Sequence, residues 1–187
     1  METLDLLQRR RSSKKFGNGV PTSEQLDTIL KAGLRAPDHG RLKPYHFIVI
    51  EKSGMETFRR CLLETAQEFD MGEEGLAKAE KLANRAPMMI AVVAKIEKDL
   101  PKVPAWEQVV TAGCATYAMQ LAANAQGFET CWITNKWVNG ASLRQAFGCR
   151  EQDQIVSLVM IGSPADADEI TMASQTEDIT PFVTYMK

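Results

Sequence analysis

The sequence lacks the patterns that would place it directly in most classes of enzyme or binding protein. Its 22 Lys and Arg residues against 24 Asp and Glu residues give a net charge of −2, so it has no cationic excess of the kind that binds nucleic acid. Its two histidines, His39 and His46, do not lie at metal-ligand spacing from cysteines or carboxylates, so we expect no metal site. Gly17 and Gly19 lack the third glycine of a dinucleotide-binding fingerprint, and neither a P-loop nor a G-x-S-x-G motif is present.

The sequence also shows no secretory signal and no convincing membrane span. Residues 1–11 carry Glu2 and Asp5 among their leucines instead of the apolar core of a signal peptide. Residues 108–128 are 21 positions without a charge, long enough to span a bilayer, but their amides and alanines favour a helix buried in protein. We therefore expect a cytoplasmic protein without a membrane partner, with the cysteines as free thiols. They are Cys61, Cys114, Cys131 and Cys149.

The composition, 44% apolar and 25% charged, is that of a soluble globular protein, and 187 residues favour one domain over 1–187. A short helix is expected to end near Arg11, and a capping box at Thr22 and Gln25 begins a second helix that stops before Pro37. Further helices are predicted at 55–69, 73–84, 107–126 and 141–147, with Gly127 as the C-terminal cap of the longest. Apolar runs predict strands at 46–50, 88–95, 131–134 and 155–161.

Two features point to a possible partner subunit. Four alanines in the long helix are spaced 3, 4 and 3 residues apart, at Ala115, Ala118, Ala122 and Ala125. Such a stripe allows close helix packing, either inside one subunit or across a dimer interface, and both interpretations stay open. The C-terminal arm, residues 179–187, contains Phe182, Val183 and Tyr185 and is too apolar to extend alone into water, so we expect it to dock on another surface, such as a partner subunit.

Two basic segments stand out in a chain of slightly negative charge. The first, residues 9–16, reads R-R-R-S-S-K-K-F, and the second, residues 35–47, reads R-A-P-D-H-G-R-L-K-P-Y-H-F. Arg forks and Ser hydroxyls suit a phosphate group, so the two segments together indicate one anionic ligand held between them. The alternative is a solvated basic surface that complements the end of the first helix.

These segments resemble the FMN-dependent nitroreductase family. The resemblance rests on R-R-S-x-[RK]-x-F at 10–16, A-P-x6-P-[WY]-x-F at 36–47, the glycine-to-tryptophan loop at 127–133 and G-x-P at 162–164. The motifs occur in the family's order over nearly the whole chain. The short length, residues 35–39 and the tail at 180–185 are most similar to the family's minimal branch.

The resemblance implies an α+β fold in which a central mixed, mostly antiparallel sheet is flanked by helices. It also implies an intertwined homodimer with FMN at the subunit interface. The activity it implies is an NAD(P)H-dependent oxidoreductase that works by a ping-pong route. NADPH or NADH gives a hydride to the flavin, and a small-molecule acceptor such as a nitroaromatic or quinone then takes the electrons. Because flavin N5 carries the chemistry, no side chain is named as catalytic.

By the same resemblance, the first motif binds the polar end of FMN. Arg10 and Ser12 are expected at the phosphate and ribityl chain, with Arg11 beside them. Lys14 matches a family position near the N1–O2 edge of the flavin. A cation is useful there because two-electron reduction places negative charge on that edge.

The other two motifs would line the ring. Arg35 and His39 would contact the flavin from the second basic segment. Cys131, Trp132 and Ile133 would pass along its other edge, with a backbone N–H of that loop facing N5. For the Cys131 side chain we favour a buried thiol without a role of its own, and for Trp132 core packing is an equal alternative.

The second motif departs from the family pattern in ways that add charge. Residues 43–45 read K-P-Y, with Lys43 and Tyr45 in place of the Gln and Trp of the family's usual Q-P-W. Arg41 stands where relatives often have Asn, and His39 stands where many members have Ser. We hypothesise a more cationic pocket that favours an anionic substrate or the 2′-phosphate of NADPH. Other flavin chemistry on the same fold, or a non-enzymatic flavin- or nucleotide-binding module, are the alternative functions.

Overall fold

The computed structural model describes residues 2–165 and 178–186, and within these one four-stranded antiparallel sheet has the strand order β1-β2-β4-β3. The strands are β1 (Tyr45–Ile50), β2 (Met88–Ala94), β3 (Glu129–Ile133) and β4 (Gln154–Gly162). All of their pairings are antiparallel. The α+β prediction with a mostly antiparallel sheet is therefore confirmed.

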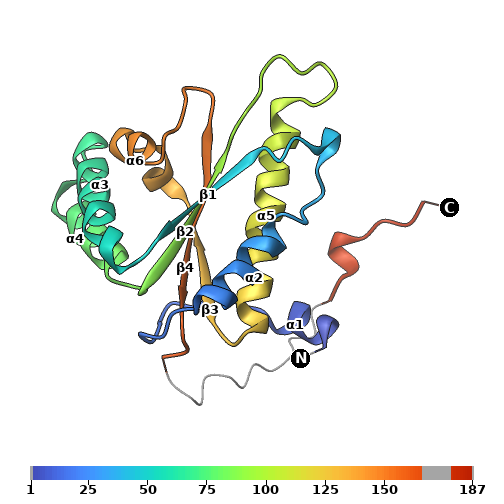
Figure 1. Ribbon diagram of the computed structural model, residues 1–187, viewed down its shortest axis with the longest axis horizontal. Helices are drawn as coiled ribbons and strands as arrows, with labels where there is room; N and C mark the ends of the chain where they lie inside the picture. Colours follow the sequence, from blue (N-terminus) through green and yellow to red (C-terminus); the bar gives the residue numbers. More distant parts are fainter. Residues whose placement is uncertain (1, 166–177, 187) are drawn as a thin grey trace.

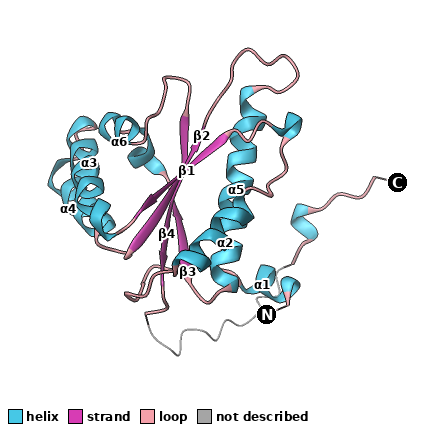
Figure 2. Cartoon of the chain, in the orientation of Figure 1, coloured by secondary structure: helices cyan, strands magenta, loops and turns pink. Residues whose placement is uncertain are grey.

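Helices cover both faces of this sheet (Figure 1). One face carries α3 (Met55–Glu68), α4 (Gly72–Ala83) and α6 (Ala141–Ala146), and the other carries α2 (Ser23–Gly33) and α5 (Ala105–Ala125). Figure 2 shows the resulting three layers. Alternate residues of β2 contribute to different cores, with Met89 and Ala91 on the α3 side and Ile90 and Val92 on the α5 side. Burial on both faces explains why β2 is apolar throughout.

The predicted elements are confirmed, with small shifts at their ends. The capping box of α2 is present: the Gln25 side chain accepts from the Thr22 N–H at 2.9 Å, and Thr22 Oγ1 accepts from the Gln25 N–H at 3.3 Å. Gly127 ends α5 with a φ of +85°, which favours glycine. The first helix, α1 (Thr3–Arg9), ends two residues early because the chain turns to extended backbone at Arg10. Because the helix ends at Arg9, residues 10–16 of the basic segment lie outside it.

The long uncharged helix α5 is buried against the sheet, and its polar side chains are hydrogen-bonded there. Gln108 accepts from the Glu97 N–H and donates to the Glu97 carbonyl, both at 2.9 Å. Thr116 Oγ1 lies 3.0 Å from Ser157 Oγ. Buried amides and hydroxyls of this kind need such partners. Among the described residues, no helix has the length and hydropathy required to cross a membrane.

The alanine stripe is only partly covered within one copy of the chain. Ala115 is buried, Ala118 and Ala122 are half-buried, and Ala125 is exposed. The described part of the C-terminal arm, residues 179–186, contains one short 3₁₀ turn, η5 (Thr180–Phe182), and extends away from α5 (Figure 1).

An ion cluster ties the end of β2 to the start of β4. The Asp153 side chain is fully buried, and its carboxylate accepts from the Ile96 N–H at 3.0 Å and from the Arg150 N–H at 2.9 Å. Lys95 Nζ lies 2.5 Å from the same carboxylate and Arg150 Nη2 lies 3.0 Å from it. Burial by itself raises the pKa of Asp153, but the hydrogen bonds from Arg150, Lys95 and the backbone outweigh it and hold the pKa well below its usual range.

Asp153→Asn should lower the free energy of unfolding by about 2 kcal/mol at pH 7, less than a fully buried ion pair would lose. The loss is smaller because Lys95 and Arg150 are 31% and 41% exposed and are partly solvated. Since the native pKa lies below the unfolded value near 4, the carboxylate's contribution is full above about pH 4 and is lost as the pH falls further. The difference between wild type and variant should therefore shrink at pH 3, as measured by urea unfolding.

The matched control is Asp27→Asn, which removes an exposed ion pair with Lys31 on α2. It should change the free energy of unfolding by less than about 1 kcal/mol at either pH. An Asp153→Asn deficit that is equally large at pH 3 and pH 7 would show that the carboxylate charge is not its source.

Candidate functional site

The first basic segment runs beside the edge strand β3. After α1 ends, the Ser13 N–H donates to the Thr130 carbonyl at 2.9 Å, and Ser13 Oγ donates to the Lys15 carbonyl at 2.8 Å. Further along, the Gly17 N–H donates to the Ser163 carbonyl at 2.8 Å, just beyond β4. The segment thus lies at the sheet edge, where it lines a cavity of about 220 Å³. The lining residues are Arg11, Ser12, Ser13, Lys14 and Lys15.

Arg10 has an incomplete set of hydrogen bonds. Its guanidinium lies over the Tyr117 ring of α5, 5.4 Å from the ring centroid. Its Nη1 atom is buried and has no hydrogen-bond partner in the structure. Leaving a buried charged donor unpaired costs free energy, so an acceptor that binds here would be stabilised.

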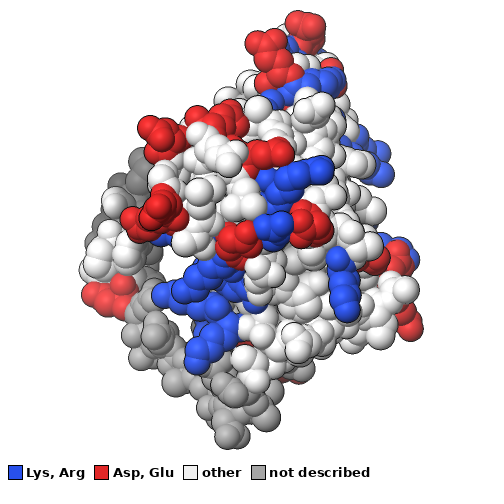
Figure 3. Space-filling view, turned by 90° about the vertical axis from the view of Figure 1, so that its left-hand side faces the viewer, with Lys and Arg blue, Asp and Glu red and all other residues white. Residues whose placement is uncertain are grey.

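The positive charges of three residues act on the thiol of Cys131. Burial raises the pKa of Cys131, while Arg85, Arg10 and Lys14 act in the opposite direction. Arg10 and Lys14 belong to the first basic segment, but Arg85 comes from the turn between α4 and β2. Figure 3 shows several Lys and Arg side chains together below the middle of one face. The arrangement is a concentration of positive charge suited to an anion.

Arg85 is a residue that the sequence analysis missed. No motif surrounds it, and nothing in residues 83–88 differs from an ordinary helix-to-strand turn. Its electrostatic effect on Cys131 depends on the sheet order, which brings the start of β2 toward β3 across β4. The positive charge that Arg85 adds to the site is therefore evident only from the three-dimensional structure.

The three predicted residues of β3 point to alternate faces. Cys131 and Ile133 pack into the core on the α3 side. Trp132 faces the other way, and its indole N–H donates to the Val156 carbonyl at 3.2 Å. Cys131 is thus a buried core residue, whereas Trp132 is half-buried.

The second basic segment forms a tight loop. The Asp38 carboxylate accepts from the Leu42 N–H at 3.1 Å and from the Lys43 N–H at 2.7 Å. Arg41 and Lys43 have φ values of +56° and +47°, a left-handed conformation that costs free energy in residues other than glycine. The loop is therefore held in a strained conformation between α2 and β1.

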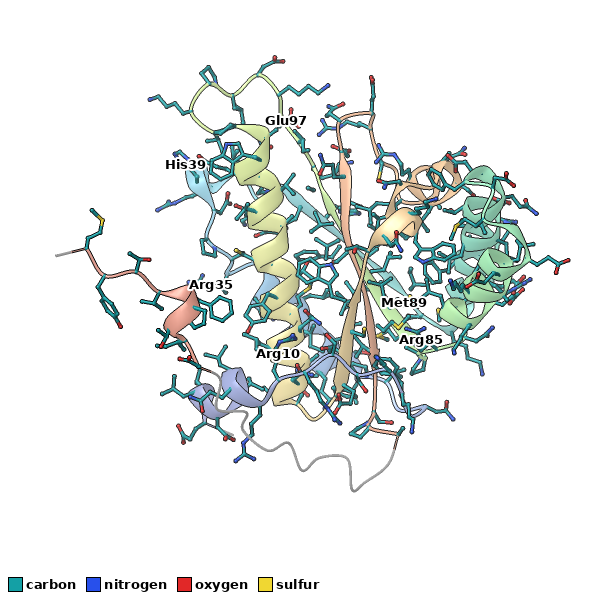
Figure 4. All side chains as sticks on the ribbon, turned by 180° about the vertical axis from the view of Figure 1, so that it is seen from behind. Arg10, Arg35, His39, Arg85, Met89 and Glu97 are labelled. Atoms are coloured by element: carbon teal, nitrogen blue, oxygen red, sulfur yellow. The ribbon has the colours of Figure 1, made fainter. Side chains whose placement is uncertain are left out.

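The structure separates the predicted residues of this loop. His39 Nδ1 lies 2.7 Å from Glu107 Oε2, in the first turn of α5. Glu107 precedes Tyr117, the partner of Arg10, by ten residues, which is about 15 Å along a helix. Figure 4 shows His39 and Arg10 toward opposite ends of α5. One copy of the chain therefore does not bring His39 to the cations around Cys131.

Arg35 lies between these two positions, beside an apolar groove of about 540 Å³ on the exposed side of α5. The groove residues are Arg35, Ala36, Pro37, Val110, Gly113, Cys114, Tyr117, Ala118 and Leu121. Tyr117 is thus shared between the groove and the ring contact with Arg10. Within residues 2–165 and 178–186, no group of three or more His, Cys, Asp or Glu side chains is placed to hold a metal ion.

Relatives with known names match the whole chain. A Haemophilus influenzae protein named "Putative NAD(P)H nitroreductase" is 53% identical over 186 residues, covering 100% of both chains. The Escherichia coli (strain K12) protein named "Putative NAD(P)H nitroreductase YdjA" is 45% identical over 185 residues, covering 99% of this chain and 100% of that protein.

Solved structures show the same fold at lower identity. A nitroreductase-like family protein from Bacillus cereus superposes with a TM-score of 0.84 at 16% identity, covering 100% of this chain and 97% of that one. A nitroreductase from Bacteroides fragilis, described with bound FMN, superposes with a TM-score of 0.74 at 21% identity over 100% of both chains. The family model described as "Nitroreductase family" matches residues 7–163. The chain belongs to the nitroreductase family.

Proposed function

We propose that this protein is an FMN-dependent oxidoreductase that takes a hydride from NADPH or NADH. It passes the electrons to a small-molecule acceptor, such as a nitroaromatic or a quinone, by a ping-pong route. The observation that carries the proposal is the unpaired, buried Nη1 atom of Arg10. No carboxylate of the described residues forms an ion pair with Arg10, Lys14 or Arg85, so their charge is available to an anionic cofactor. The four cysteines are free thiols, which supports a cytoplasmic location.

The residues around this site fit FMN. The cofactor's phosphate carries nearly two negative charges and accepts strong hydrogen bonds from an Arg fork and a Ser hydroxyl. Arg10 supplies a donor without a partner, and Arg11, Ser12 and Lys14 line the adjoining cavity. When bound, FMN supplies a ring that accepts and returns a pair of electrons.

The chain's own part in the reaction is binding and electrostatics. Arg10 and Ser12 hold the phosphate and ribityl chain, and Lys14 places positive charge near the edge of the ring that becomes negative on reduction. Cys131, Trp132 and Ile133 contribute through the backbone of β3, because their side chains are engaged in packing. Hydride transfer needs no side-chain acid or base, so positioning and electrostatics would provide most of the rate enhancement.

We further propose that the working unit is a homodimer. His39 lies against the first turn of α5, and Arg10 lies over Tyr117, ten residues further along that helix. In line with the family resemblance, the second basic loop of the other copy would supply Arg35 and His39 to the flavin. The apolar groove on α5 and the exposed aromatic residues of the arm fit this arrangement. Phe182 is 84% exposed and Tyr185 is 78% exposed, an unusual state for aromatic side chains in water.

The visible spectrum of the purified protein tests the proposed function. We expect flavin bands that bleach when NADPH or NADH is added without oxygen and return when an acceptor is added. Bands that never bleach would instead support a flavin carrier or other flavin chemistry. A colourless protein that takes up no added FMN would contradict the proposal outright.

Arg10→Ala should weaken FMN binding on the order of 10- to 100-fold, because a hydrogen bond to a charged group contributes about 1.5–3 kcal/mol. Turnover per remaining bound flavin should stay close to that of the wild type. The measurement is flavin absorbance per protein together with turnover per flavin. Arg9→Ala is the control, since Arg9 is exposed and pairs with Asp5 at 2.6 Å. Full flavin content with lost turnover would show that the role assigned to Arg10 is wrong.

Ala118→Arg should convert the dimer to a monomer and lower flavin content, because it places a charge in the apolar groove of α5. Light scattering at micromolar concentration measures the mass, and urea unfolding checks that the subunit still folds. Thr28→Arg, an equal charge change on the exposed side of α2, should leave the mass unchanged. A monomeric wild-type protein that retains FMN would contradict the dimer proposal.

A further inference from the structure

Arg85 differs from the arginines of this fold whose guanidinium groups are paired with carboxylates. Arg59 pairs with Glu56 and Glu80, and Arg150 pairs with Asp153 and Glu97. Arg85 is half-buried, yet in the part of the chain that the structure describes its guanidinium forms no hydrogen bond and no ion pair. Partly removing a guanidinium from water without a partner is unfavourable unless a ligand compensates.

Arg85 also connects two parts of the molecule. On one side it belongs to the three cations around Cys131. On the other it lines a cavity of about 840 Å³ between the loop at 16–21, the turn before α3 and the end of α4. Figure 4 shows Arg85 close to Met89, at the beginning of β2. Phe16, the last residue of the first basic motif, lines the same cavity, so the motif leads from the phosphate-binding region into it.

The cavity has the make-up of a site for a small amphipathic molecule. Most of its lining is apolar, including Phe16, Val20, Met55 and Met88. Volumes of 300–1,000 Å³, apolar walls and a few fixed polar groups are typical of small-molecule sites. Its remaining lining residues are Asn18, Pro21, Glu51, Lys52, Ala83, Asn84, Arg85, Ala86 and Pro87.

The charges of the lining favour an anion. Glu51 and Lys52 are adjacent, exposed and opposite in sign, so they offset each other and leave Arg85 as one excess positive charge. A guanidinium fork matches the two oxygens of a carboxylate better than it matches a neutral amide.

We propose that this cavity binds the electron acceptor as an amphipathic carboxylate, with the apolar body against Phe16 and Met88 and the carboxylate on Arg85. The acceptor role rests on the proposed oxidoreductase function, whereas carboxylate binding at Arg85 does not. Under this proposal the electron acceptors are small carboxylic acids with an aromatic or branched apolar body.

Calorimetric titration of the purified full-length protein with benzoate and with benzamide tests the binding step. We expect benzoate to bind at least about 10-fold more tightly than its neutral isostere, as a charge-assisted pair implies. Arg85→Gln should abolish this preference, and Arg85→Lys should retain part of it. Lys52→Gln, which removes the other cation of the same cavity, should reduce the preference far less than Arg85→Gln does, because Lys52 and Glu51 are both exposed and their charges are screened by salt.

Turnover supplies a second, separate readout. Arg85→Gln should lower kcat/KM for 4-nitrobenzoate about 10-fold or more while leaving 4-nitrobenzamide nearly unchanged. Equal binding of benzoate and benzamide, or a preference that survives Arg85→Gln, would overturn the inference even if the flavin is reduced normally. A benzoate preference that depends on Arg85 in a protein that takes up no FMN would support the carboxylate site and contradict the oxidoreductase proposal instead.

Discussion

The basic segment is anchored to the sheet by backbone hydrogen bonds, first from the Ser13 N–H to the Thr130 carbonyl and then from the Gly17 N–H to the Ser163 carbonyl. An edge strand has unpaired backbone groups on its outer side, and the first of these bonds uses one of them. With the segment anchored there, Arg10 lies against Tyr117 of α5, and the charge of Lys14 acts on Cys131 of β3. The early end of α1 makes this possible, because a helix continued through Arg11 would have kept these residues away from the sheet.

The arginines of this chain divide into two groups by how their charge is compensated. Arg144 donates to the carbonyls of Asp153, Arg150 and Glu151, and Arg59 is paired with two carboxylates. Such residues stabilise the fold and have little capacity left for a ligand. Arg10 retains a buried unpaired donor, and Arg85 has a guanidinium without a partner among residues 2–165 and 178–186, although the whole chain is slightly acidic. A positive charge left uncompensated inside an acidic chain is better explained by a ligand than by stability.

Short sequence patterns predicted the helices and strands well, because the residues that determine each of them lie within it or next to it. The capping box at Thr22, the apolar run of β2 and the glycine after α5 act within a few residues, and all three appear as predicted. The resemblance added the sheet type, and residues 11–15 of the first motif line one cavity. Contacts between distant segments had no such signal. The pair of His39 with Glu107 joins residues 68 positions apart, and Arg85 reaches Cys131 only through the order of the strands.

The distribution of the site along α5 links cofactor binding to assembly. The first turn of the helix carries Glu107 with His39, and its middle carries Tyr117 with Arg10, about 15 Å away. Each copy would therefore hold two half-sites, and in the proposed dimer each flavin would contact one half from each copy. A ligand that bridges two subunits binds the dimer more tightly than the monomer, so binding and association strengthen each other by the same free energy. The apolar groove between the half-sites then contributes to flavin affinity without touching the flavin, because it holds the second half-site in place.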